Sequence, residues 1–480
     1  LKHITSHESK KLLWITLGIS VIYFIILRLI YPLPSFCGDS YTFIATARYD
    51  YPVSYRPILY SKYMNFFHLF SKSDVALIAA QYLSNIVANL FLFFTCTWFF
   101  SFTKSYRYLL FILLICNPFY LFYSNYITSD PFFNSLTVLW FTLLIWMMNR
   151  SSWFIIIVQL VILSQLFLIR YNAIIFPLFM WIAVLLGKHS FWKRTLSISA
   201  SILLIGVFVY INTQINYKKT GTKTFTAFSG WQLANNAMHI VRHKDIDTTN
   251  ISDKDVKHLI TYSKAFFDTS KDYIPEYASS WYMWFYKSPL KQYMNEYEGR
   301  SKYYFRTWSA LGPIYNKLGR TIILQNPGSY LRYFVLPNSK EYILPRMEIY
   351  RNYFEHVDTI GLIARQFYGY KESKIPAKKQ VVYDIVFTPW KYLFPLMNLL
   401  FIGLTIWYVG KRKYKEQLKL FNYTLLNFTA LYVANFFFIV LLAPTVFRYH
   451  IFIITIGYPI ILLLLQQVKL QKPIVVDSKI

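Results

Sequence analysis

Most of the acidic residues of this chain lie in one segment, and the few outside it are the first candidates for chemistry. Fifteen of the 22 acidic residues lie between positions 214 and 386. The other seven are Glu8, Asp39, Asp50, Asp74, Asp130, Glu416 and Asp477. Asp39 and Asp130 each stand where a polar stretch meets an apolar one, in separate parts of the chain. If they converge on one face, these carboxylates could accept a proton from a hydroxyl, hold a cation or bind a sugar hydroxyl.

Two arginines stand at comparable junctions. Arg170 closes one apolar run and Arg448 opens another. A guanidinium group offers a planar set of hydrogen-bond donors that matches the oxygens of a phosphate or diphosphate. Carboxylates and guanidinium groups on the same face would therefore suit a reaction in which a phosphate or diphosphate leaves.

Ordinary structural roles also explain some of these residues. Asp130 follows Ser129 and precedes Pro131, a combination that starts helices well because proline is favoured at the first helical position. Arg170 and Arg448 could instead extend from helix ends to the membrane interface. Asp39 follows Gly38, where a turn residue is expected. However, Asp39 is the first acid after the first apolar run, on the side that we predict to be outside, and this position favours a functional role.

Ten apolar runs must position these residues. They occupy roughly 12–31, 76–100, 107–123, 131–148, 153–169, 171–187, 195–213, 387–409, 420–442 and 446–466. Each has about 17–25 residues, long enough to cross a hydrocarbon layer about 30 Å thick as a helix. The composition agrees, with 55% hydrophobic, 20% aromatic and only 15% charged residues. We expect an all-α polytopic membrane protein with about 10 transmembrane helices, or 11–12 if segments such as 57–70 are re-entrant.

Positive charge occurs in alternate loops, which predicts the orientation. These loops contain Lys10, Lys11, Lys104, Arg107, Arg150, Lys188, Lys193, Arg194, Lys411, Arg412, Lys413, Lys415, Lys469 and Lys472. By the positive-inside rule they are cytoplasmic, so ten crossings place both termini in the cytoplasm and residues 214–386 outside. Much of the net charge of +28 lies in these loops, near anionic headgroups. No basic run is combined with a nucleic-acid-binding module, so we expect no nucleic acid partner.

Three parts follow from this topology. Residues 1–213 form an N-terminal transmembrane module with a first outside loop at 32–75. Residues 214–386 form an extracytoplasmic domain that is mainly helical, because Asn250–Asp268 has polar caps and apolar residues at helical spacing. Residues 387–480 contain the last transmembrane helices and a cytoplasmic tail.

The ordered set of short motifs resembles a known family. After its first span, the chain has an acid in the first outside loop. The motifs that follow, in order, are Arg56-Pro57-Ile58-Leu59-Tyr60, Asn117-Pro118, Ser129-Asp130, Ile169-Arg170-Tyr171-Asn172, Ser229-Gly230-Trp231, Asn326-Pro327 and Phe447-Arg448-Tyr449. This order is similar to that of the polyprenyl-phosphate-sugar-dependent glycosyltransferases of the GT-C fold, particularly the bacterial relatives of protein mannosyltransferases and of aminoarabinose transferase. Members of that family often have Asp-Glu in the first loop, whereas Asp39 is followed here by Ser40.

The resemblance implies a GT-C-like bundle and a set of roles. Asp39 would be the general base, and Asp130 would orient the acceptor or support a cation. The donor phosphate would be bound by Arg170, Arg448 and Arg56. Acceptor or lipid contacts are expected from Tyr41, Tyr60, Tyr171, Tyr449 and Trp231.

The expected partners are a polyprenyl-phosphate-linked sugar donor, an acceptor that is a lipid, glycan or protein, and membrane lipids. No cofactor is assigned. No His or Cys cluster has metal-ligand spacing, so a divalent cation would depend on carboxylates alone. Two other functions stay open at this point: a ligase or polymerase of lipid-linked glycans, and a transporter or flippase of a lipid-linked anion. The abundance of Lys, Ile, Tyr and Phe is typical of an AT-rich bacterial genome, which favours the bacterial inner membrane.

Overall fold

The computed structural model describes residues 7–50, 56–270, 274, 277, 279–345, 347, 353–376 and 380–470. The predicted cytoplasmic tail after Leu470 lies outside this part of the chain. Within it, every regular element is a helix, and the only β-pairings are two isolated bridges.

The chain is a helical polytopic membrane protein. In the described residues, eight helical stretches are long and apolar enough to cross a membrane: α1 (His7–Ile30), α4 (Val75–Phe99), α5 with α6 (Lys104–Leu114 and Phe119–Ser124), α7 (Asp130–Asn149), α10 (Phe191–Thr220), α19 with α20 (Gln380–Phe387 and Trp390–Gly410), α21 (Lys419–Leu442) and α22 (Ile451–Leu470). Two of the predicted runs form shorter apolar helices: α8 (Trp153–Ile169), and η1 (Tyr171–Ile175) continued by α9 (Phe176–Leu186). Each of the ten predicted runs is therefore largely helical.

The predicted outside loop at 32–75 contains two further helices. These are α2 (Gly38–Tyr49) and α3 (Leu59–Phe70), which pack against each other. Helix α3 covers most of segment 57–70, which we named above as a candidate re-entrant segment. Its Tyr60 and Met64 are buried, whereas Leu69 and Phe70 are exposed.

A second group of helices has a hydrophobic core of its own. It contains α11 (Phe228–Val241), α12 (Lys254–Thr269), α13 (Trp281–Trp284), α14 (Pro289–Glu296) and α15 (Tyr304–Gln325). Helices α11 and α15 lie very close together because Gly230 and Gly312 lack a Cβ that would collide across the interface. Helix α12 starts at the predicted polar cap, where the Asp253 carboxylate accepts a hydrogen bond from the Val256 N–H at 3.0 Å.

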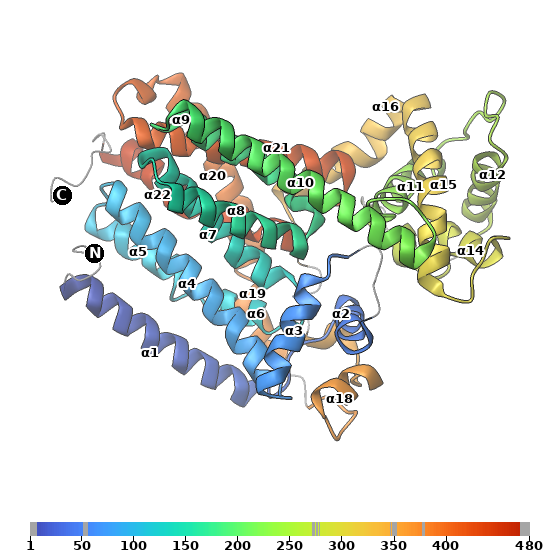
Figure 1. Cartoon of the computed structure of the whole chain (residues 1–480), viewed down its shortest axis with the longest axis horizontal. Coiled ribbons are helices and arrows are strands. Elements are labelled where there is room, and N and C mark those ends of the chain that lie inside the picture. Colours follow the sequence, from blue (N-terminus) through green and yellow to red (C-terminus); the bar gives the residue numbers. More distant parts are fainter. Residues whose placement is uncertain are drawn as a thin grey trace.

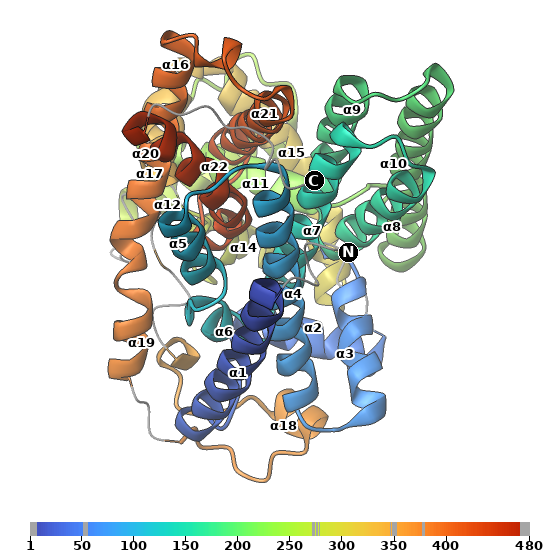
Figure 2. The same ribbon diagram turned by 90° about the vertical axis from the view of Figure 1, so that its left-hand side faces the viewer.

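The chain returns from this group to the bundle through α16 (Pro327–Tyr330), η2 (Leu331–Val335) and α17 (Leu336–Ile343). It then passes through η4 (Tyr353–His356) and α18 (Leu362–Tyr368), and two short 3₁₀ turns, η5 (Lys413–Lys415) and η6 (Phe447–Tyr449), precede α21 and α22. Figure 1 shows that the start of α1 and the end of α22 lie at one end of the bundle, and α11, α12, α14 and α15 at the other. In Figure 2, α8, α9 and α10 form one flank of the bundle, and α19 and α20 form the opposite flank.

Candidate active site

A short backbone pairing brings the two candidate acids together. The Ser35 N–H donates to the Asn125 carbonyl at 2.8 Å, and the Ile127 N–H donates to the Ser35 carbonyl at 3.1 Å. Asp39 lies just after this pairing, in the first turn of α2, and Asp130 lies just after it as the first residue of α7. The pairing therefore places two helix N-termini, each carrying an aspartate, next to each other.

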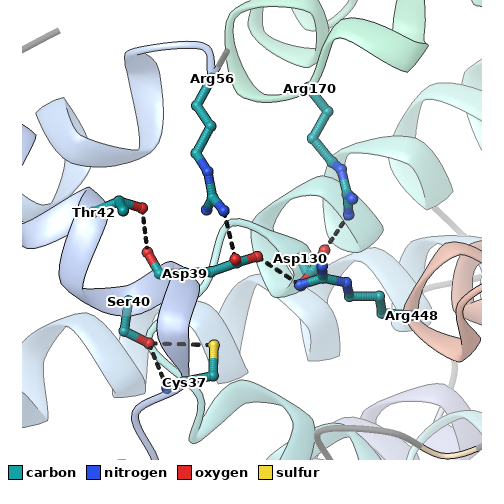
Figure 3. Close-up of polar contacts among 8 residues, drawn as sticks. All are labelled: Cys37, Asp39, Ser40, Thr42, Arg56, Asp130, Arg170 and Arg448. Carbon is teal, nitrogen blue, oxygen red and sulfur yellow. Dashed lines mark hydrogen bonds and ion pairs between the residues drawn. The ribbon is translucent and has the colours of Figure 1, made fainter. Parts of the chain in front are cut away.

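Three arginines from distant segments surround these two carboxylates (Figure 3). Arg56 forms an ion pair with Asp39, and Arg170 forms one with Asp130. Arg448 lies between the acids, 2.8 Å from Asp39 Oδ2 and 3.6 Å from Asp130 Oδ2. We call these five residues the Asp39 cluster. Its three guanidinium groups and two carboxylates leave one net positive charge.

The two carboxylates of the Asp39 cluster differ in exposure. The Asp130 side chain is 2% exposed, whereas the Asp39 side chain is 27% exposed. Burial opposes ionisation of Asp39, but the guanidinium groups of Arg56 and Arg448 outweigh it and hold the pKa of Asp39 well below its usual range. Asp39 is therefore an ionised carboxylate that borders solvent, and Asp130 is the inner, more enclosed acid.

Two arginines of the Asp39 cluster make cation–π contacts with aromatic rings. The Arg56 guanidinium lies 4.9 Å from the ring centroid of Phe43, and that of Arg170 lies 4.6 Å from the ring of Tyr449. Such cation–π contacts stabilise the positive charge of a guanidinium group without neutralising it.

A buried asparagine holds the segment that leads to Arg448. Asn338 of α17 is fully buried, and its side-chain amide donates to the last carbonyl groups at the end of α21, those of Ile439, Val440 and Ala443, at 3.2, 3.2 and 2.7 Å. Its Oδ1 accepts from the Thr445 N–H at 2.7 Å, and its backbone carbonyl accepts from the Thr445 hydroxyl at 3.1 Å. The Ile439 carbonyl also accepts from the Ala443 N–H at 2.9 Å, so the amide of Asn338 matters most to the helix-end carbonyls of Val440 and Ala443. The hydrogen bonds of Asn338 also fix the turn that precedes Arg448.

The predicted aromatic residues are more scattered than the charged ones. Tyr449 contacts Arg170 and Arg448 and belongs beside the Asp39 cluster. The Tyr41 hydroxyl accepts from the Gly361 N–H at 3.2 Å, which joins α2 to the start of α18.

The other three predicted aromatic residues make hydrogen bonds or packing contacts within the fold. Tyr60 is buried and donates to Gln81 at 2.7 Å. Tyr171 accepts from the Asn212 amide of α10 at 2.9 Å. Trp231 lies in the core of the second helical group, stacked on Trp308 with the ring centroids 5.0 Å apart. This packing gives Trp231 a structural role.

Both carboxylates of the Asp39 cluster are paired with arginines. Among the residues that the structure describes, no group of three or more His, Cys, Asp or Glu side chains could hold a metal ion. Asp39 and Asp130 both face guanidinium groups, so a cation would have to displace an arginine to reach them. The arrangement instead suits an anion that competes with the carboxylates for the arginines.

Comparison with known proteins does not extend this description. No family model, curated protein or solved structure matches the chain.

Two features of the site region have no counterpart in the sequence patterns. One is Asn338, which stands in an aromatic stretch and belongs to none of the motifs. The other is a buried ion pair between Arg28 at the end of α1 and Asp74, 2.6 Å apart, to which the Tyr370 hydroxyl also donates at 2.9 Å. Asp74 is one of the seven isolated acids, but the polar residues before it, Ser71-Lys72-Ser73, gave no sign of a buried ion pair. Asn338 likewise precedes a polar stretch, Ser339-Lys340-Glu341.

Proposed function

We propose that this chain is an integral membrane glycosyltransferase that transfers a sugar from a polyprenyl-phosphate donor to an acceptor. The observation that carries the proposal is the Asp39 cluster, in which a solvent-bordering carboxylate lies beside guanidinium groups with a net positive charge. A donor of this kind is a phosphodiester with one negative charge, which would balance that excess.

The arginines would bind the phosphate and stabilise it as it leaves. In the reaction, the acceptor hydroxyl oxygen attacks the anomeric carbon, the bond from that carbon to the phosphate oxygen breaks, and polyprenyl phosphate departs with the electron pair. The departing phosphate gains negative charge, and preorganised guanidinium donors lower the energy of that state. Arg448 is suited to this role because it already lies between the two acids.

Asp39 would take the proton from the acceptor hydroxyl. Its two arginine partners make it a weak base while the site is empty, because they favour the ionised form. When a phosphate engages Arg56 and Arg448, they are shared with the ligand and Asp39 becomes more basic. Donor binding would thus prepare the base for the acceptor. Asp130 would remain paired with Arg170 and orient that side of the site.

The finer topology belongs to the same proposal. Eight of the predicted runs are long enough to span the membrane, and α8 and the η1–α9 segment would add two further crossings within the packed bundle. We propose that the chain crosses the membrane ten times in the orientation of the positive-inside rule, with residues 214–386 and the Asp39 cluster on the extracytoplasmic face of a bacterial inner membrane. The GT-C family and its polyprenyl donors remain our inference from the ordered motifs.

The position of the charged residues favours a glycosyltransferase over a transporter or flippase of a lipid-linked anion. Transporters commonly bind their substrate near the bilayer midplane, at interrupted helices. The five charged residues here instead lie at helix ends and in the segments between them: before α3, at the start of α2 and α7, after α8 and before α22. A ligase or polymerase of lipid-linked glycans would use a similar site, and the donor it consumes would distinguish it.

The test uses the purified full chain in detergent, a panel of polyprenyl-monophosphate sugars and native membrane extract as acceptor. Wild type should release polyprenyl phosphate. Asp39→Asn, which keeps the size and one acceptor oxygen, should lose about 10²–10⁴-fold in rate if Asp39 is the base. Asp50→Asn is the matched control, because Asp50 follows the same helix but is exposed and pairs with Lys62 at 2.9 Å, outside the Asp39 cluster.

Three outcomes are informative. Release by wild type and by Asp50→Asn but not by Asp39→Asn supports the proposal. Equal release by Asp39→Asn removes Asp39 from the base role and makes Asp130 the candidate. Release from polyprenyl-diphosphate donors only would favour the ligase or polymerase.

A further inference from the structure

A lysine is buried among aromatic rings in the second helical group, far along the chain from the Asp39 cluster. Lys291 of α14 is 8% exposed. Its Nζ lies 4.5 Å from the ring centroid of Trp231, 5.2 Å from that of Tyr304 and 5.8 Å from that of Trp284. We call Trp231, Trp284, Lys291 and Tyr304 the Lys291 site.

The charge of Lys291 has no counter-ion in the part of the chain that the structure describes. Its one hydrogen bond is from Nζ to the Tyr304 hydroxyl, at 2.6 Å. A lysine ammonium has three donor hydrogens, and a hydroxyl satisfies only one of them. Burying a charge without an opposite charge is unfavourable, and the aromatic faces offset only part of this loss.

Two of the aromatic side chains around Lys291 are exposed to solvent. Trp284 is 41% exposed and Tyr304 is 48% exposed, whereas Trp231 is fully buried and forms the base. Their neighbours Tyr286 and Tyr303 are 67% and 47% exposed, and Lys287, Lys302 and Arg306 are exposed as well. The surface around Lys291 therefore combines flat aromatic faces with positive charge.

We propose that the Lys291 site binds an anionic saccharide, in which a carboxylate or phosphate group pairs with Lys291 and a sugar ring lies on Trp284 or Tyr304. The anion would supply the missing counter-charge through charge-assisted hydrogen bonds. The half-exposed aromatic rings provide the flat apolar surfaces that the C–H face of a sugar ring packs against. For the anion to reach Nζ, the Tyr304 hydroxyl has to give up or share its hydrogen bond.

A soluble or cell-envelope saccharide suits this site better than a membrane lipid. Figure 1 shows α14 at the end of the molecule that carries α11, α12 and α15, away from the start of α1. Helix α10 has 30 residues, or about 45 Å at 1.5 Å per residue, so it extends beyond a hydrocarbon layer about 30 Å thick before it reaches this group. Lys291 therefore lies on the aqueous side of that helix end.

The experiment measures binding, so it is valid whether or not the chain transfers sugars. The full chain in nanodiscs of neutral phosphatidylcholine is titrated with tetra-mannuronate, a carboxylate-bearing oligosaccharide, and with cellotetraose as the neutral probe of equal length. Lys291→Met keeps the length of the side chain and removes the charge. Lys257→Met is the matched control, because Lys257 is exposed on α12.

We expect wild type and Lys257→Met to bind the mannuronate in preference to cellotetraose, and Lys291→Met to bind it at least about tenfold more weakly. If Lys291→Met does not fold, Trp284→Leu provides the test, since it removes an exposed aromatic side chain and should weaken binding by a similar factor. Equal binding by wild type and both variants would overturn the proposal. A second titration uses nanodiscs that also contain anionic phosphatidylglycerol. A lack of mannuronate binding combined with binding of phosphatidylglycerol there would also overturn the proposal, because it would assign the site to lipid.

Discussion

A carboxylate that is paired with two guanidinium groups is a weak base. It becomes more basic when one of these guanidinium groups also binds another anion. Asp39 is paired with Arg56 and Arg448, and its pKa is held low against the opposing effect of burial. Under the proposed function, the phosphate of the donor is the other anion. The residues that bind the donor would therefore also control the basicity of the residue that activates the acceptor.

Arg448→Ala should raise the KM for the donor more than the KM for the acceptor. A charge-assisted hydrogen bond contributes about 1.5–3 kcal/mol, so we expect roughly a ten- to hundredfold increase in the donor KM. The measurement is steady-state transfer with each substrate varied in turn. Arg107→Ala is the control, because Arg107 pairs at 3.2 Å with Glu8 in a different part of the molecule. A larger change in the acceptor KM would reject the phosphate role of Arg448.

Lys291 leads to a prediction about pH. Burial lowers the pKa of Lys291 from 10.5 to about 8. Between pH 8 and 10.5 the unfolded chain binds more protons at this residue than the folded chain, so the free energy of unfolding rises with pH in that window. Below pH 8 the folded protein must keep a buried charge. Wild type should therefore gain stability relative to Lys291→Met as pH rises from 7 to 10.

The gain should be at most about 3 kcal/mol, since one pKa unit corresponds to about 1.4 kcal/mol and the cation–π contacts oppose the shift. It is measured as the difference between the thermal midpoints of wild type and Lys291→Met in detergent at each pH. Titration of the other lysines and tyrosines cancels in that difference. A pH-independent difference would show that folding does not lower the pKa of Lys291.

At the scale of elements, periodicity and length predicted the helices but not their contacts. The apolar runs are each largely helical, and the Asp253 cap begins α12 close to the expected position. Helix α2 was not predicted, because its sequence is short and mixed, whereas α3 lies within segment 57–70, which we named as a candidate re-entrant segment. The buried role of Asn338 could not be predicted either, since its partners lie about a hundred residues away. Local patterns do not encode such contacts.

Asn338→Ala should destabilise the protein by about 2–4 kcal/mol, because it leaves several buried backbone groups without partners. The end of α21 and the turn at Thr445 should loosen, and Arg448 should lose its fixed position. We therefore expect a lower thermal midpoint together with a higher KM for the donor. Asn295→Ala, at an exposed position on α14, should change neither quantity. A lower midpoint with an unchanged donor KM would limit Asn338 to a structural role.

At the scale of the whole molecule, the distribution of positive charge predicts a sidedness that can be measured. In a variant with Ala at the three cysteines, Cys37, Cys96 and Cys116, single cysteines are introduced by Lys257→Cys on α12 and Lys413→Cys on η5. A membrane-impermeant maleimide should label Lys257→Cys in right-side-out vesicles and Lys413→Cys only in inverted ones. Labelling of both positions from the same side would contradict the ten-crossing topology.

The candidate site shows where inference from sequence ends. Asp39, Asp130, Arg170 and Arg448 were selected because charged residues are rare at the ends of apolar runs, and Arg56 because of its motif. The structure brings all five together. Their pairing, and the position of Arg448 between both acids, depends on how distant helices pack, which spacing along the chain does not reveal. Trp231 shows the opposite case, since its motif is explained by packing in a core.

The separation of Asp39 and Arg448 has a consequence for biosynthesis. The two residues form an ion pair although 409 positions separate them in the chain. A ribosome delivers Asp39 and Asp130 to the membrane long before it has made Arg448. Until α22 is inserted, these acids lack one of their cations, and α21 is not yet followed by the turn that Asn338 fixes. Nascent or prematurely terminated chains therefore cannot form the complete site. The ion pair between Asp39 and Arg448 can form only after synthesis and insertion have reached the last helix.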